Sequence, residues 1–178
     1  MSFTTSWLDE SSAEKVIAIL QERLSALNDL HLTLKHIHWN VVGPNFIGVH
    51  EMLDPQVTAV RDYADTLAER IATLGGSPRG TANAIEADRS WNDYSLGRDT
   101  AQAHLAALDL VYDGFIATYR SAISSTEAPD PVTQDILIGQ CAELEKFQWF
   151  VRAHLENSEG VLDHSDSRTE VDAAKAAR

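Results

Sequence analysis

The chain has 178 residues and a formal net charge of −13. This length suits a single domain with a core of its own. The negative charge argues against a nucleic-acid-binding surface spread over the whole body, because phosphates are bound by clustered lysines and arginines. No window approaches a membrane span, residues 1–14 lack a signal-peptide pattern, and Cys141 has no intrachain disulfide partner. We therefore expect a cytoplasmic protein without a membrane partner, in which Cys141 is a small core residue.

Apolar residues recur at helical spacing along four long segments. We predict helices from a cap at Ser11 or Ser12 to Asn40, from after Gly48 to Leu74, and from about Leu96 to Ser125. A fourth helix follows Pro131 and ends near Asn157 to Gly160. No strand signal competes with them. Short first and third connections and a long second one predict an all-α, ferritin-like four-helix bundle with one long crossover, which carries a short extra helix within residues 79–97.

This prediction divides the chain into three parts. Residues 12–157 form the bundle, and residues 1–11 form a flexible N-terminal segment. Residues 158–178 are polar, so we expect a mobile C-terminal tail there.

Two pairs of possible metal ligands lie in the second predicted helix. His50 is four residues before Asp54, and Asp65 is four before Glu69. Residues four apart share a helix face, and all four side chains fall within about 100° of one another on an ideal helix. At about 1.5 Å of rise per residue, however, the pairs are separated by roughly 16 Å along the axis. One chain cannot bind a single ion with both pairs.

A second copy of the helix can complete the site. If two copies pack antiparallel about a two-fold axis near residues 59 and 60, His50 and Asp54 of one chain face Asp65 and Glu69 of the other. His38 ends the first helix, a short hairpin away from the second, and can reach the same site. Imidazole and carboxylate ligands together suit iron(II), manganese or zinc, and carboxylates also tolerate iron(III).

Each pair also has an ordinary structural explanation. His50 and Asp54 can form a surface hydrogen bond, and Asp65 can form a helical salt bridge with Arg61, four residues earlier. The chain has no Glu-x-x-His sequence, which argues against the usual di-iron site within one bundle. Five possible ligands together favour a metal site, from which we leave out His31 and His36.

Three runs of residues resemble the Dps family, also called mini-ferritins. They are KHIHWNVVGPNF from Lys35, HEMLD from His50, and Asp65 to Arg70. The resemblance implies an intersubunit ferroxidase centre with His38, His50 and Asp54 from one chain and Asp65 and Glu69 from its partner. It further implies a homododecameric shell that binds iron, with two ions possible per site, oxidises Fe(II) preferentially with hydrogen peroxide, stores ferric mineral, and protects the cell and its DNA from oxidative damage. Zinc or manganese could substitute for iron.

The resemblance implies roles for residues outside this ligand set. Trp39 is placed where the family has an aromatic residue that intercepts stray oxidising equivalents, although packing at an interface explains it equally well. Asp130 and Asp135, together with Glu127, match an acidic segment that lines iron-entry pores. Asp130 lies between two prolines, where an acid also serves as a cap or turn former.

Two other functions remain open from the sequence. One is a nucleoid-binding, DNA-compacting protein with secondary iron chemistry; residues 158–178 give this little support, because they hold three basic and five acidic residues, a net charge of −2. The other is a hydrolase of amides or esters that activates water at the same metal site.

Overall fold

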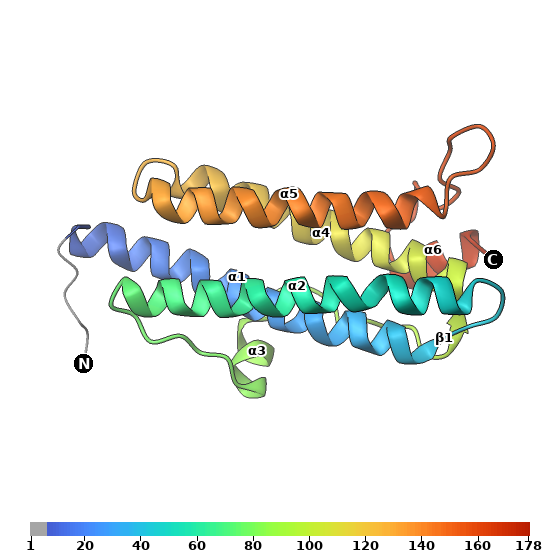
Figure 1. The fold of residues 1–178 in the computed structure, drawn as a ribbon, viewed down its shortest axis with the longest axis horizontal. Helices are drawn as coiled ribbons and strands as arrows, with labels where there is room; N and C mark the ends of the chain where they lie inside the picture. Colours follow the sequence, from blue (N-terminus) through green and yellow to red (C-terminus); the bar gives the residue numbers. More distant parts are fainter. Residues whose placement is uncertain (1–6) are drawn as a thin grey trace. The chain divides into compact units, whose positions relative to one another are not determined.

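The computed structural model describes residues 7–178, which are mainly helical (Figure 1). In chain order the elements are α1 (Glu10–Asn40), β1 (Val41–Val42), α2 (Phe46–Thr73), α3 (Ala82–Asp88), β2 (Asp99–Thr100), α4 (Ala101–Thr126), α5 (Pro131–Ala153) and α6 (Glu170–Ala176). The four predicted long helices and the short helix in the second connection are confirmed. No helix in residues 7–178 is long and apolar enough to cross a membrane.

The predicted cap of the first helix was wrong. Asp9 caps α1, because its carboxylate accepts hydrogen bonds from the backbone N–H of Ser12 at 3.0 Å and from the Ser12 hydroxyl at 2.6 Å. These bonds lower the pKa of Asp9 below its ordinary value. The helix therefore begins at Glu10, and of the predicted flexible segment only residues 1–6 lie outside the described residues.

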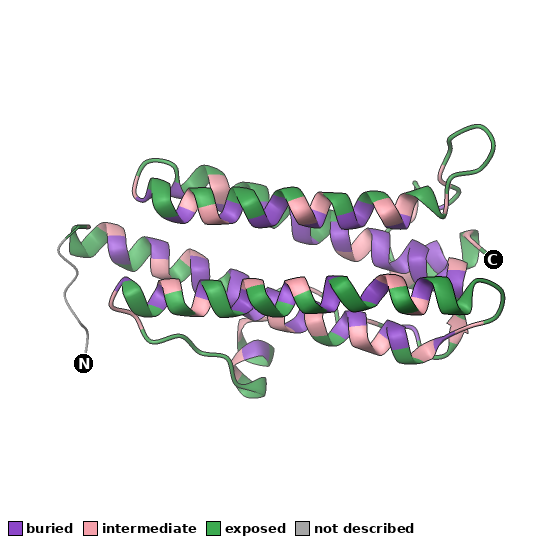
Figure 2. Ribbon diagram, in the orientation of Figure 1, coloured by how far each residue is buried: buried purple, intermediate pink, exposed green. Residues whose placement is uncertain are grey.

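Contacts within the chain define two compact units, and each of the four long helices contributes to both. Among the described residues, the first unit comprises 7–32, 58–92 and 118–141. Its core comes from apolar positions three or four residues apart, which place one stripe of each helix inward. Figure 2 shows this recurrence as buried turns along the helices. The most buried positions of this unit include Val16, Leu20, Leu27, Val60, Leu67, Ile71, Tyr119 and Leu137.

The second unit comprises residues 33–57, 93–117 and 142–178. Its buried positions include Leu34, Ile37, Leu53, Leu105, Leu108, Tyr112, Leu144 and Val151. This unit contains a parallel two-residue pairing in which Val41 is opposite Asp99 and Val42 is opposite Thr100. Strands this short have no sequence period to detect. Helix α4 begins at Ala101, later than predicted, and the Thr100 hydroxyl accepts from the backbone N–H of Ala103 at 3.2 Å.

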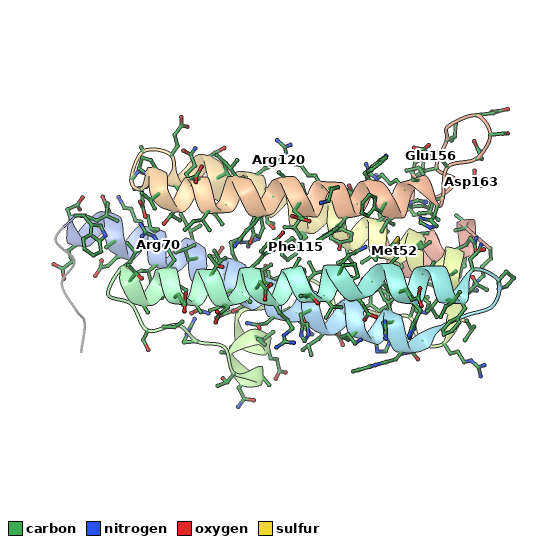
Figure 3. All side chains as sticks on the ribbon, in the orientation of Figure 1. Met52, Arg70, Phe115, Arg120, Glu156 and Asp163 are labelled. Atoms are coloured by element: carbon green, nitrogen blue, oxygen red, sulfur yellow. The ribbon has the colours of Figure 1, made fainter. Side chains whose placement is uncertain are left out.

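The C-terminal segment differs from the mobile tail that we predicted. It contains α6, and Ala174 of that helix is buried in a cluster with Leu96, Ala103 and Ala107. The loop before α6, where Figure 3 labels Glu156 and Asp163, leads into His164, whose Nε2 lies 2.9 Å from the buried Asp109 carboxylate. A polar composition predicted mobility, but a small apolar face and one buried hydrogen-bonding partner hold this segment in place.

Replacing His164 should loosen this segment. His164→Ala leaves one oxygen of the buried Asp109 carboxylate without its partner, which costs about 1–3 kcal/mol. We expect faster amide hydrogen exchange in α6 and faster proteolysis after α5. Lys175→Ala is the matched control, because the ion pair between Lys175 and Asp172, at 3.8 Å, is exposed to solvent and contributes little to stability. Equal exchange rates in the His164 variant and the wild type would contradict this account.

Candidate metal centre

His38 and His50 lie side by side where the hairpin joins α1 to α2. The hairpin turns through Gly43 and Asn45, both with positive φ, values that glycine and asparagine tolerate best. The two imidazole rings stack with centroids 3.5 Å apart and planes inclined by 24°. Nδ1 of His38 is 3.0 Å from the carbonyl oxygen of His50, and Nδ1 of His50 is 2.8 Å from the carbonyl oxygen of His38.

These reciprocal bonds determine which nitrogen carries the proton. A carbonyl oxygen only accepts, so both Nδ1 atoms must donate. In the neutral imidazole the lone pair is then on Nε2. Metal-binding histidines are commonly oriented in this way, with one ring nitrogen bonded to a carbonyl and the other directed to the metal. The fold therefore leaves Nε2 of both rings outside these bonds, on two side chains held close together.

Asp54 lies one helical turn after His50 and is exposed. Its carboxylate is 3.3 Å from Nζ of Lys35 and 3.4 Å from Nδ1 of His38. The three sequence-predicted ligands of the hairpin are therefore brought together, and the sequence analysis missed Lys35. Its position three residues before His38 on the same helix was the available signal. A cation bound by Asp54 has to compete with this ammonium group.

Asp65 and Glu69 lie in the other unit, further along α2, and both are exposed. The salt bridge to Arg61 that could have explained Asp65 is not formed within residues 7–178, and neither acidic side chain has an ion-pair partner there. In that same range of the chain, no three His, Cys, Asp or Glu side chains converge closely enough to hold a metal ion. The donors of one chain do not by themselves make a closed site.

Asp130 is a structural residue in this fold. Asp130 is 3 % exposed, and its carboxylate accepts a hydrogen bond from Nη2 of Arg70 at 2.7 Å. The carboxylate also accepts from the Thr133 hydroxyl and from the backbone N–H of Val132, so that Asp130 caps the start of α5. Figure 3 labels Arg70 on α2. Burial raises the pKa of Asp130, but the bonds from Thr133 and Arg70 outweigh it and the net pKa is lowered. Of the predicted pore acids, only Glu127 and Asp135 are exposed.

The remaining predicted residues have clear positions. Trp39 is 71 % exposed, and Nζ of Lys35 lies 5.9 Å from its ring centroid. Cys141 is buried in the first unit, as expected for a core residue. His36, which we left out of the metal site, places Nε2 at 2.7 Å from the carbonyl oxygen of Leu96.

Comparisons with known proteins assign the family. A ferritin-like domain family matches residues 17–161. A relative from Mycolicibacterium smegmatis, named DNA protection during starvation protein, is 63% identical over 177 residues, which are 99% of this chain and 97% of that protein. The solved structure of Mycobacterium smegmatis Dps matches at 63% identity with a TM-score of 0.93, covering 95% of this chain and 97% of that one. The chain belongs to the Dps family.

Further Dps structures agree with this assignment. DpsA14 from Streptomyces coelicolor is 57% identical, with a TM-score of 0.88, and covers 90% of this chain and 95% of its own. The fold is therefore the ferritin-like four-helix bundle of Dps proteins. Iron storage with ferroxidase activity is the general role of this family.

The ion pair between Asp130 and Arg70 should make the free energy of unfolding depend on pH in the acid range. Asp130→Asn removes one partner of a buried ion pair, which costs about 3–5 kcal/mol at neutral pH. The lowered pKa means that this stability is present above the ordinary aspartate value of 3.8 and is lost as the pH falls through the folded-state value. Denaturant unfolding at several pH values should show the two proteins converging below about pH 4. A difference that stays constant down to pH 2 would rule out the ion pair as its source.

Proposed function

We propose that the protein is a ferroxidase and iron store whose centre forms between two subunits, with Fe(II) as the substrate. The observation that carries this proposal is the reciprocal bonding of His38 and His50, in which each ring uses Nδ1 and keeps Nε2 out of these bonds. The Asp54 carboxylate lies 3.4 Å from Nδ1 of His38, so an acid is close to the pair of rings. Two imidazoles and a carboxylate suit Fe(II), which both kinds of ligand bind.

The partner subunit supplies the rest of the proposed centre. Asp65 and Glu69 are exposed acids without ion-pair partners in residues 7–178, on the same helix as His50 and Asp54. In an antiparallel pair of α2 helices, these acids face His50 and Asp54 of the neighbour, and the two-fold axis produces two equal sites. Exposed Trp39, Phe46 and Ile47, which flank the hairpin, support a subunit interface there, because large apolar side chains seldom gather in solvent without a partner.

The ligand set suits oxidation by peroxide. Carboxylates stabilise the Fe(III) product, since they are hard, charged oxygen donors. When two Fe(II) ions each give one electron to one hydrogen peroxide, two protons are taken up and two waters form, without release of hydroxyl radical. A shell of twelve subunits would then hold the ferric mineral, with Glu127 and Asp135 as the exposed acids available to an entry pore.

DNA binding through the C-terminal segment is the weaker alternative. The Arg178 guanidinium pairs with Asp99, and Lys175 lies 3.8 Å from Asp172, so acids of the same subunit already neutralise these cations. Binding to phosphate would have to displace them. No specific contact favours the hydrolase alternative.

Mixed subunits test the intersubunit centre directly. One variant carries His50→Ala with Asp54→Ala, and the other carries Asp65→Ala with Glu69→Ala. Each variant alone should lose the fast phase of Fe(II) oxidation, because every site lacks one pair of ligands. Co-expressed, a mixed dimer has one site with all four residues intact, so the fast phase should return in part. Stopped-flow absorbance of Fe(III) measures this.

The control co-expresses two differently tagged copies of the first variant, and these assemblies should stay inactive. Recovery only in the true mixture supports a centre shared between chains. If the mixed protein is as inactive as its parents although it assembles normally, the sites lie within single subunits and the partition is wrong. Titration should also consume about two Fe(II) per peroxide, as expected when carboxylate-rich sites oxidise paired ions.

A further inference from the structure

Tyr94, Tyr112 and Tyr119 each have a hydroxyl bonded to a side chain, and the partner of Tyr94 is chemically different from the other two. The Tyr112 hydroxyl donates to Oε1 of Gln56 at 2.6 Å, and the Tyr119 hydroxyl donates to Oε1 of Gln140 at 2.7 Å. The Tyr94 hydroxyl instead lies 2.9 Å from Nδ1 of His104. A neutral amide does not take a proton at ordinary pH, whereas an imidazole does. Tyr94 is thus bonded to a base.

The pair lies inside the second unit, next to the part of α1 that carries His38. Tyr94 is partly buried against the cluster of Leu96, Ala103, Ala107 and Ala174, and His104 is fully buried. The ring of His36 meets Tyr94 edge-on with centroids 5.8 Å apart. The pairing of β1 with β2 further joins the segment after α1 to the segment after Tyr94.

The surroundings keep both partners neutral before any reaction. Burial lowers the pKa of His104, partly opposed by Asp99 and by the backbone carbonyls of Asn40 and Gly97. Burial also raises the pKa of Tyr94, and the negative charges of Glu170 and Asp99 raise it further. At neutral pH a protonated phenol therefore faces an uncharged imidazole.

The tautomer of His104 matters to the direction of this bond. Nε2 is buried and makes no hydrogen bond among residues 7–178, while the carbonyls of Asn40 and Gly97 only partly offset the lowering of the ring's pKa by burial. A proton on Nε2 places the lone pair on Nδ1, where the Tyr94 hydroxyl can donate to it. The separation of 2.9 Å lies within the range of about 2.6–3.2 Å over which a base removes a proton.

We propose that Tyr94 and His104 form a redox-active pair that gives one electron to strong one-electron oxidants such as hydroxyl radical. The oxidant takes one electron from the phenol and becomes hydroxide; the O–H bond of Tyr94 breaks and its proton forms an N–H bond on Nδ1 of His104. The products are a neutral phenoxyl radical and an imidazolium, whose charge Asp99 stabilises. An Fe(II) ion later returns the electron, becoming Fe(III), and the proton returns to Tyr94.

The inference depends on the proposed ferroxidase function only for the source of the oxidant. A single Fe(II) that meets hydrogen peroxide releases hydroxyl radical, whereas paired ions do not. A donor beside the α1 segment would remove the escaped oxidant before it damages the shell. Trp39, exposed on the same helix, is a separate side chain and has no base bonded to it in the described structure.

A photochemical oxidant tests the pair without iron. Flash-generated tris(bipyridyl)ruthenium(III) is applied to the intact, iron-free protein, and the phenoxyl radical is followed by electron paramagnetic resonance and optical absorption. We expect a long-lived tyrosyl signal in the wild type and loss of most of it in Tyr94→Phe. His104→Gln should also lose most of it, because that change gives Tyr94 the same amide partner that Tyr112 and Tyr119 have.

Tyr112→Phe is the matched control and should keep the full tyrosyl signal. Circular dichroism melting establishes that each variant is folded. A tyrosyl signal in Tyr94→Phe equal to that of the wild type would overturn the assignment to Tyr94. A full signal in folded His104→Gln would overturn the role of His104 as proton acceptor. Because the oxidant contains no iron, neither result depends on whether the ferroxidase centre works.

Discussion

The end of α1 and the start of α2 are joined by two hydrogen bonds, each from an imidazole to the backbone carbonyl of the other histidine. The carbonyl of His38 lies in the last turn of α1, where backbone acceptors lack partners within the helix, so the His50 ring satisfies one of them. The same two bonds place the protons on Nδ1 and leave Nε2 for a metal. The hairpin geometry and the donor set therefore have one origin, and any change that separates the rings alters both.

The acids of this chain fall into two groups with different roles. Buried Asp109 is bonded to Arg152, Gln148 and His164, and buried Asp130 is bonded to Arg70, so these carboxylates hold segments together. Exposed acids on α2 such as Asp65 and Glu69 make no such bonds within the described chain. A net charge of −13 is thus less informative than its distribution. Acids that the fold does not use are the ones available to a cation or a partner subunit.

Residues 94–107 connect the hairpin to the C-terminal segment. His36 of α1 bonds the Leu96 carbonyl, and Glu170 of α6 accepts from the backbone N–H and hydroxyl of Ser95, each at 2.8 Å. Tyr94 is held between these contacts in a setting of low polarity, which keeps its hydroxyl protonated and bonded to His104. Ordering of the C-terminal segment therefore affects the environment of this pair.

The sequence by itself determined the four long helices, the short helix of the crossover and the spacing of His50, Asp54, Asp65 and Glu69, because helical periodicity is a local property. It also indicated that one chain cannot gather these ligands. Only the tertiary structure decided which nitrogens of His38 and His50 are protonated, that Asp130 is a cap paired with Arg70, and that α6 is docked. These features depend on contacts between residues far apart in the chain, such as the 60 positions from Arg70 to Asp130, and no local pattern encodes such contacts.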